Sequence, residues 1–182
     1  TITLSNNGGA YNSGNVEAGT FVDPKLRASS IKNDAGDMTS IEITMDGEAV
    51  ESGTSSPLDY NGPDVLIGDN TVVFKATAGY DDAPVKTNNL GAESKENWFE
   101  GGSVSSGEFK YTGKRKLFYG TGVGELPEIT SDMVRGLNNS YLAPYQGYSF
   151  NVNVAVGQQF IVIAYPDTLR DLNNVTYVEA ND

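Results

Sequence analysis

Carboxylates are the most abundant groups in this sequence that could do chemistry. The chain of 182 residues has 24 Asp and Glu against 12 Lys and Arg, which gives a formal net charge of −12. Asp34 and Asp37 lie in the polar segment 33–37, and calcium takes several such oxygens from a flexible loop. The segment lacks the ligand spacing of an EF-hand and is more typical of a turn held by an Asp or Asn side chain. Asp34 and Asp37 are therefore weak calcium candidates, with a turn as the alternative.

The commonest catalytic devices are excluded because the sequence contains neither His nor Cys. A Ser–His–Asp triad, a Cys–His pair, and zinc or iron held by imidazole or thiolate all require one of these residues. A glycosidase would need only two acids facing each other across a cleft. The acids are spread along the chain, however, and their spacing favours no particular pair. We predict that the protein is not an enzyme and uses no cofactor.

Aromatic side chains in polar surroundings are candidates for contact surfaces, since aromatic rings are enriched at interfaces and stack well on other rings. Trp98 and Phe99 stand together in a polar segment, and Tyr145 lies between Tyr141 and Tyr148. Ordinary packing in the core or in loops is the alternative for all five. We select Trp98 and Tyr145 as candidate interface residues.

One helix is predicted near residues 131–138. Thr130 or Ser131 can cap its first turn, and the apolar residues that follow recur at helical spacing. Arg135 lies in this helix, where it can pair with a nearby acid or contact another subunit. We include Arg135 among the candidate interface residues.

Alternating apolar and polar residues predict a mainly β protein. Residues 39–45 and 71–78 alternate, residues 160–165 form a continuous apolar run, and Asp46-Gly47 is a strong hairpin signal. Seven or eight short strands separated by turn residues favour a sandwich. We expect an immunoglobulin-like β-sandwich followed by a second β-rich module that contains the helix.

The expected domain limits follow from these strands. Residues 1–14, rich in Asn, Gly and Ser, are expected to form an extended arm, residues 15–112 the sandwich, and residues 113–182 the second module. The sequence starts at Thr1 without a visible signal peptide and ends just after a predicted strand. We therefore expect a piece of a longer protein, truncated at its C-terminus.

The charge balance also limits the partners. Phosphate binding needs a Lys- and Arg-rich surface, so an acidic chain argues against nucleic acid and against anionic membranes. No apolar run is long enough to cross a bilayer. We expect neither partner, and we expect the acidity to keep free subunits apart.

The second half of the sequence carries several motifs in a fixed order. They are GKRKLFYGT at 113–121, TSDMVRGLN at 130–138, FNV at 150–152 and VGQQFIVIAYP at 156–166, preceded by the segments 78–84, 87–91 and 101–103. In this order they resemble structural proteins of tailed bacteriophages over about residues 70–182. The resemblance implies a virion component, of the tail or baseplate type, and it implies no catalytic or binding residues.

The leading hypothesis is a bacteriophage structural protein that assembles with copies of itself and with other virion proteins, and is located in the extracellular particle. Capsid decoration or a head fibre is a close variant. A carbohydrate- or receptor-binding module of a tail tip or bacterial surface adhesin is the alternative, with Trp98 stacked on a host glycan. A glycosidase is a third hypothesis.

Overall fold

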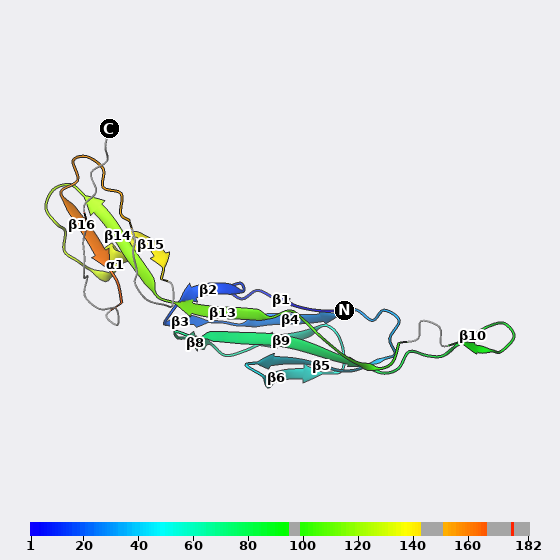
Figure 1. Ribbon diagram of the computed structural model, residues 1–182. Helices are drawn as coiled ribbons and strands as arrows, with labels where there is room; N and C mark the ends of the chain where they lie inside the picture. The colour runs from blue at the N-terminus through cyan, green and yellow to red at the C-terminus, as the bar shows by residue number, and fades with distance from the viewer. Residues whose placement is uncertain (95–98, 143–150, 167–175, 177–182) are drawn as a thin grey trace. The chain divides into compact units, whose positions relative to one another are not determined.

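The computed structural model describes residues 1–94, 99–142, 151–166 and 176. Within these residues the chain is mainly β with one short helix, as predicted, and it has sixteen strands where the sequence predicted seven or eight. It divides into two compact units, Thr1–Gly113 and Lys114–Asp182 (Figure 1). The division follows one residue after the expected limit at residue 112.

The first unit is an immunoglobulin-like sandwich of two facing sheets. Its strands are β1 (Ile2–Asn6), β2 (Gly14–Glu17), β3 (Thr20–Val22), β4 (Lys25–Ser30), β5 (Met38–Met45), β6 (Glu48–Gly53), β7 (Leu58–Asn61), β8 (Val65–Ile67), β9 (Thr71–Tyr80), β10 (Lys86–Thr87), β11 (Glu93–Ser94), β12 (Gly102–Ser105) and β13 (Phe109–Lys114). One sheet has the order β1-β4-β7, and the other has the order β2-β13-β9-β5-β6, with β12 also paired to β9. The pairs β3–β8 and β10–β11 form two small separate sheets.

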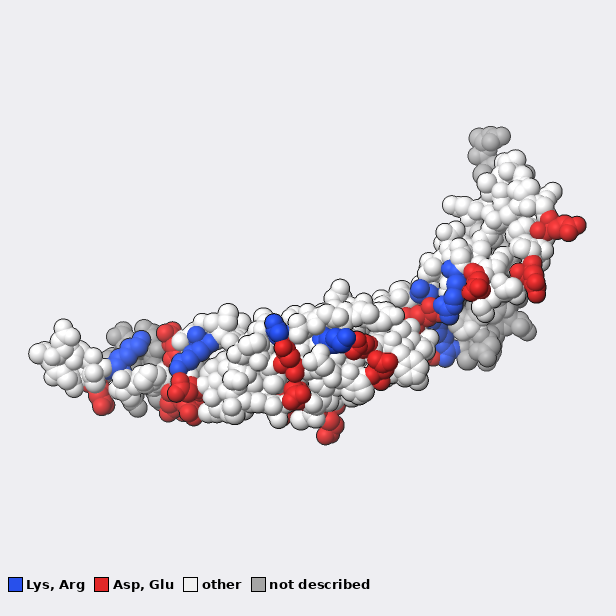
Figure 2. Space-filling view, turned by 180° about the vertical axis from the view of Figure 1, so that it is seen from behind, with Lys and Arg blue, Asp and Glu red and all other residues white. Residues whose placement is uncertain are grey.

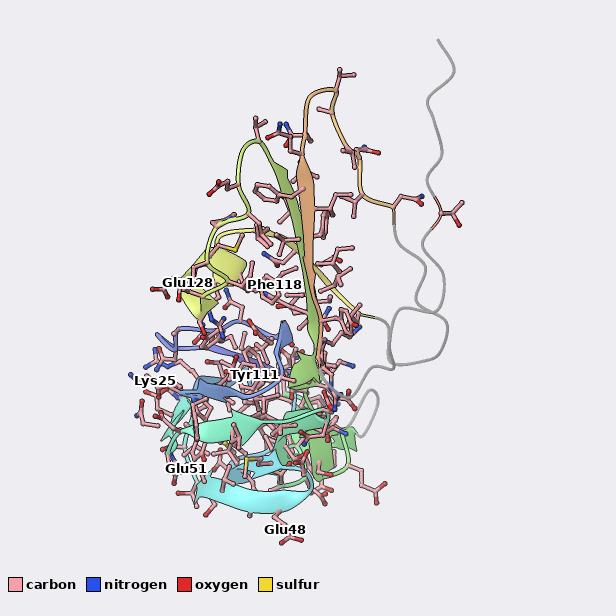
Figure 3. All side chains as sticks on the ribbon, turned by 90° about the vertical axis from the view of Figure 1, so that its left-hand side faces the viewer. Lys25, Glu48, Glu51, Tyr111, Phe118 and Glu128 are labelled. Atoms are coloured by element: carbon pink, nitrogen blue, oxygen red, sulfur yellow. The ribbon has the colours of Figure 1, made fainter. Side chains whose placement is uncertain are left out.

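The core of this unit forms because the strands bury every second side chain. Strand β9 turns Val72, Phe74, Ala76, Ala78 and Tyr80 inward, which confirms the strand predicted from the alternation at 71–78. The ring centroid of Phe74 lies 6.1 Å from those of both Tyr60, on the facing sheet, and Tyr111, on β13. Figure 3 shows Tyr111 inside the unit. The aromatic contacts therefore join the two sheets at their centre.

The hairpin predicted at Asp46-Gly47 is confirmed between β5 and β6. Both turn residues have positive φ, 50° for Asp46 and 93° for Gly47, as a tight hairpin turn of this type requires. The carboxylate of Asp46 also accepts a hydrogen bond from the backbone N–H of Val73 on β9, at 2.8 Å. The turn is thereby tied to the neighbouring strand.

The N-terminal segment differs from the extended arm expected at residues 1–14. Strand β1 pairs antiparallel with β4, so that Leu4 lies opposite Ala28, and Ile2 is buried in the core. Apolar residues at positions 2 and 4 point to the same face of the strand, and their burial outweighs the turn signals that follow them. The segment is an edge strand of the sandwich.

A buried serine joins β12 and β13, which both pair with β9. The hydroxyl of Ser106 accepts a hydrogen bond from the N–H of Ala76 at 3.0 Å and donates one to the carbonyl of Gly107 at 2.7 Å. Replacing Ser106 with Ala would leave the buried N–H of Ala76 unpaired. We expect the free energy of unfolding, measured by urea denaturation, to fall by about 1–3 kcal/mol. An equal loss in the exposed variant Ser103→Ala would contradict this assignment.

An ion pair on the outer face of the β1-β4-β7 sheet predicts a pH dependence. Arg27 donates to both carboxylate oxygens of Asp59, at 2.6 and 2.7 Å, from the directly opposite position on β4. These hydrogen bonds lower the pKa of Asp59 below its usual value. The stability they contribute is present above the unfolded-state pKa of about 3.9 and is lost as the pH falls through the lower folded-state pKa.

The variant Asp59→Asn tests this linkage. At neutral pH we expect it to unfold at a lower urea concentration than the wild-type chain. The gap between the two midpoints should close in strongly acidic buffer, because Asp59 is then protonated in both the folded and the unfolded state. A gap that stays constant with pH would show that the charge of Asp59 contributes nothing.

The second unit is built around β14 (Lys116–Gly122). This strand lies between β15 (Asn138–Tyr141) and β16 (Phe160–Ala164), antiparallel to both. Strand β16 falls within the predicted apolar strand at 160–165 and confirms it. The alternation at residues 148–154 also predicts a strand, but residues 151–154 are not in one, and residues 148–150 lie outside the described residues. A last strand predicted at 175–178 lies outside the described residues except for residue 176.

The helix α1 (Ser131–Arg135) is shorter than predicted. Thr130 caps it as expected, since its hydroxyl accepts from the N–H of Met133 at 3.2 Å. The helix ends at Arg135, with Gly136 as its C-cap, rather than at residue 138, because Asn138 already begins β15 and pairs with Tyr119 of β14. Pairing in the sheet therefore overrides the local helical signal of the last residues.

Candidate contact arm

A hairpin between β9 and β12 is the feature of the first unit best suited to contact another molecule. We call the described residues of this hairpin, 81–94 and 99–101, the arm. The ladder between the two strands runs up to the pair Tyr80 and Gly102, and it continues into the arm through a hydrogen bond from the N–H of Ala83 to the carbonyl of Phe99, at 2.9 Å. Strands β10 and β11 pair further out, and β10 lies beyond the end of the sandwich (Figure 1). The arm is therefore an extension of the main sheet.

The base of the arm is fixed by the loop at 33–37. The N–H of Gly36 donates to the carbonyl of Asp81 at 3.0 Å, and the N–H of Asp81 donates to the carbonyl of Asp37 at 2.9 Å. The carboxylate of Asp82 accepts from the N–H of Gly101 at 2.6 Å, which ties the two sides of the arm together. A Cβ on Gly36 would lie 2.2 Å from the carbonyl oxygen of Asp82, so only glycine fits this close approach.

The tip of the arm is a turn organised by Asn88. Its side-chain oxygen accepts from the N–H groups of Leu90 and Ala92, each at 2.9 Å. Its backbone N–H donates to the carbonyl of Ala92 at 2.9 Å, and Gly91 takes a positive φ of 78°. Turns in which an Asn side chain binds nearby backbone N–H groups are locally stable, so the conformation of the tip is defined without a partner.

This turn holds a large apolar side chain in solvent. Leu90 is 93% exposed, and Val85 and Phe99 on the arm are 39% and 38% exposed. A single exposed Leu is unremarkable on a protein surface. Here three large apolar side chains belong to one hairpin, which makes the arm a candidate for burial against a partner.

The arm is also acidic. The sequence over residues 81–101 contains five acidic residues and two lysines. Figure 2 shows acidic side chains where the arm leaves the sandwich, with basic side chains beside them. An apolar tip on an acidic stem can bind a surface that combines apolar and basic groups.

The two calcium candidates, Asp34 and Asp37, lie in the loop at the base of the arm. The carboxylate of Asp37 pairs with the ammonium of Lys32 at 2.7 Å, and the hydrogen bond from Lys32 lowers the pKa of Asp37. Asp34 lies exposed in the same loop. In the described part of the chain, no three acids come together to form a group that could hold a metal ion. The backbone of this loop supports the arm instead.

The three predicted interface residues fall in different places. Trp98, between the two described segments of the arm, and Tyr145 both lie outside the described residues. Arg135 is exposed in the last turn of α1, where a positive charge is favourable beside the C-terminal end of a helix. The structure therefore does not bring these residues together in one described site.

Residues 79–102 show no strand-like alternation and read from the sequence as a loop, so sequence reasoning did not select Leu90. The turn residues Asn88, Asn89 and Gly91 could have indicated the hairpin, because a polar segment of similar length lies on each side of them. Leu90 is exposed because its turn lies at the end of a pair of hydrogen-bonded strands. Residue types alone do not reveal that pairing.

Comparisons with known proteins leave the family open. No family model matches the chain, and no curated protein matches it. Among solved structures, it is similar to the fibronectin(III)-like modules of Clostridium thermocellum CbhA, with 19% sequence identity and a TM-score of 0.33. The match covers 62% of this chain and 96% of that one. Separately, none of the helices in the described residues is long and apolar enough to span a membrane.

Proposed function

We propose that this chain is a structural component of a tailed bacteriophage particle, in its tail or baseplate, and that it acts by assembly rather than by catalysis. Its partners in this proposal are copies of itself and other virion proteins. The arm is the observation that carries the proposal. A hairpin that holds Leu90 93% exposed at its tip is suited to contact with another protein surface.

The sandwich suits this role because one of its edge strands, β6, is a poor alternative for contact. Strand β6 is an edge of the larger sheet, and Glu48 points away from it (Figure 3). Glu51 places a second acid on the same strand. Charged side chains on an edge strand oppose pairing with another strand, so contact through the arm is favoured over edge-to-edge pairing.

The phage context of the proposal comes from the motifs of the second half. The segments 113–121 and 130–138, which carry much of the resemblance, span the end of β13, most of β14, the whole of α1 and the first residue of β15. They are elements of the β framework rather than of a pocket. This fits a family whose members share a framework for assembly, and it suits a protein without His or Cys.

Mass spectrometry of purified particles tests the proposal. Particles from the source culture are separated on a density gradient, and peptides of this chain are quantified in each fraction. We expect the peptides to follow the particle fractions and to remain after a high-salt wash. Peptides found only in the soluble fractions or the cell envelope would contradict a virion role, and the envelope result would favour a surface adhesin.

A further inference from the structure

The chain contains two Asn-Gly pairs, Asn7-Gly8 and Asn61-Gly62. The side-chain amide of an asparagine can be attacked by the backbone nitrogen of the next residue. Glycine hinders this attack least, because it has no Cβ and its backbone turns freely. The attacking nitrogen must also be able to leave any hydrogen bond that holds it. The surroundings of the two pairs differ in this respect.

The Asn61-Gly62 pair is held by the fold. Asn61 is the last residue of β7 and lies opposite Lys25 on β4. The N–H of Gly62 donates to the carbonyl of Pro24 at 3.1 Å. A Cβ on Gly62 would lie 2.2 Å from the hydroxyl of Tyr60, so this backbone is also closely packed. The Gly62 nitrogen can reach the Asn61 side chain only after this end of the strand has opened.

The Asn7-Gly8 pair is open at its second residue. Gly8 is exposed just beyond the end of β1 and has a positive φ of 96°. A Cβ there would meet no heavy atom of the described residues within 4 Å, and none of the described backbone carbonyls accepts a hydrogen bond from its N–H. Asn7 itself is held, since its backbone N–H donates to the carbonyl of Lys25 at 2.7 Å and its side-chain amide donates to Asp59 at 3.2 Å. The Gly8 peptide can therefore turn toward a side chain that stays in place.

We propose that Asn7 is a site of spontaneous deamidation in the folded protein, with water as the co-reactant and hydroxide as the base. The backbone nitrogen of Gly8 loses its proton to hydroxide and forms a bond to Cγ of Asn7. The Cγ–Nδ2 bond then breaks, and ammonia leaves with a proton taken from water, which closes a succinimide ring. Water opens the ring at either carbonyl. The product is aspartate, or isoaspartate with the main chain routed through Cβ.

The modification acts on the ion pair beside Asn7. Oδ1 of Asp59 accepts from the side-chain amide of Asn7 at 3.2 Å and from Nε of Arg27 at 2.6 Å. Deamidation replaces the amide donor with a second carboxylate, and two carboxylates at this distance repel each other. Both then compete for the one guanidinium of Arg27, so the folded state loses stability at neutral pH. The end of β1 is thereby weakened as the protein ages.

Peptide mapping by mass spectrometry compares the two sites in one molecule. The folded full-length chain is incubated in mildly alkaline buffer, which favours the deprotonated backbone nitrogen, and is then digested with trypsin. Asn7 and Asn61 fall in separate tryptic peptides. We expect Asn7 to convert at least about tenfold faster than Asn61, because conversion of Asn61 requires local opening of the strand. In the urea-unfolded chain the two rates should be similar, since both asparagines precede glycine.

The variant Asn7→Asp tests the effect on stability, with Asn7→Gln as its matched control. Gln keeps the amide, but its longer side chain closes a ring with the next nitrogen far more slowly. We expect Asn7→Asp to unfold at a lower urea concentration than the wild-type chain, and the wild-type midpoint to fall during incubation while that of Asn7→Gln stays constant. Adding Asp59→Asn to Asn7→Asp should remove the loss, because the second carboxylate is then absent.

Three results would overturn the inference. They are equal conversion of Asn7 and Asn61 in the folded chain, conversion of both sites only after unfolding, and an Asn7→Asp variant as stable as the wild-type chain. The inference does not depend on the proposed assembly role, because it concerns the chemistry and stability of the first unit alone.

Discussion

Replacing Phe74 with Ala should lower the free energy of unfolding of the first unit by about 3–5 kcal/mol, the usual cost of emptying a buried aromatic site. Phe74 is 0% exposed, and its ring contacts Tyr60 and Tyr111 between the two sheets. The loss therefore includes both the transfer energy of the ring and the cavity left among residues that cannot close over it. A domain of this kind is commonly stable by only about 5–15 kcal/mol, so the variant should be near its limit.

Phe21→Ala is the matched control for Phe74→Ala. It makes the same substitution at a side chain that is 61% exposed, on β3 of the same unit. We expect its free energy of unfolding to fall by less than about 1 kcal/mol. Urea unfolding followed by circular dichroism measures both variants. Equal losses would mean that the Phe74 cluster is not the centre of the core.

Replacing Gly36 with Ala should detach the base of the arm. The new Cβ would lie 2.2 Å from the carbonyl oxygen of Asp82 and 2.5 Å from that of Asp81, both in the backbone. Because backbone atoms cannot rotate away, the loop must move and lose its hydrogen bonds with Asp81. We expect a loss of about 1–3 kcal/mol in the free energy of unfolding, and faster hydrogen exchange at the Gly36 and Asp81 amides.

Gly107→Ala provides the control for this variant. A Cβ at Gly107 meets no heavy atom within 4 Å, and its φ is not in the left-handed region. Its stability and its exchange pattern should remain close to those of the wild-type chain. If Gly36→Ala exchanged as slowly as Gly107→Ala at the base of the arm, the loop at 33–37 would not support the arm.

The regular alternation of apolar and polar residues was enough to predict the central strand of the first unit. Strand β9 has five alternating inward residues, so its burial follows from the sequence pattern alone. The Asp46-Gly47 turn was equally predictable, because positive φ at two adjacent positions strongly selects these residue types. These features depend on neighbours along the chain, which a sequence displays directly.

The arm and the ends of elements could not be predicted in the same way. Strands β10 and β11 have two residues each, too few for any alternation, and they form only because β9 and β12 bring the two segments together. Similarly, α1 stops early because Asn138 pairs with β14. Such features depend on contacts between distant residues. For the candidate site, sequence reasoning selected residues in or beside the arm, such as Trp98 and Asp37, but not Leu90.

Immunogold electron microscopy of the source's particles, with antibody raised against this chain, tests the central claim most directly. The claim is that the chain is an assembled part of a phage tail or baseplate. Gold particles concentrated at the tail or baseplate are the predicted result, and gold over the head would move the chain to capsid decoration. Particles without label, in a preparation whose cell surfaces are labelled, would contradict the virion role and favour a surface adhesin.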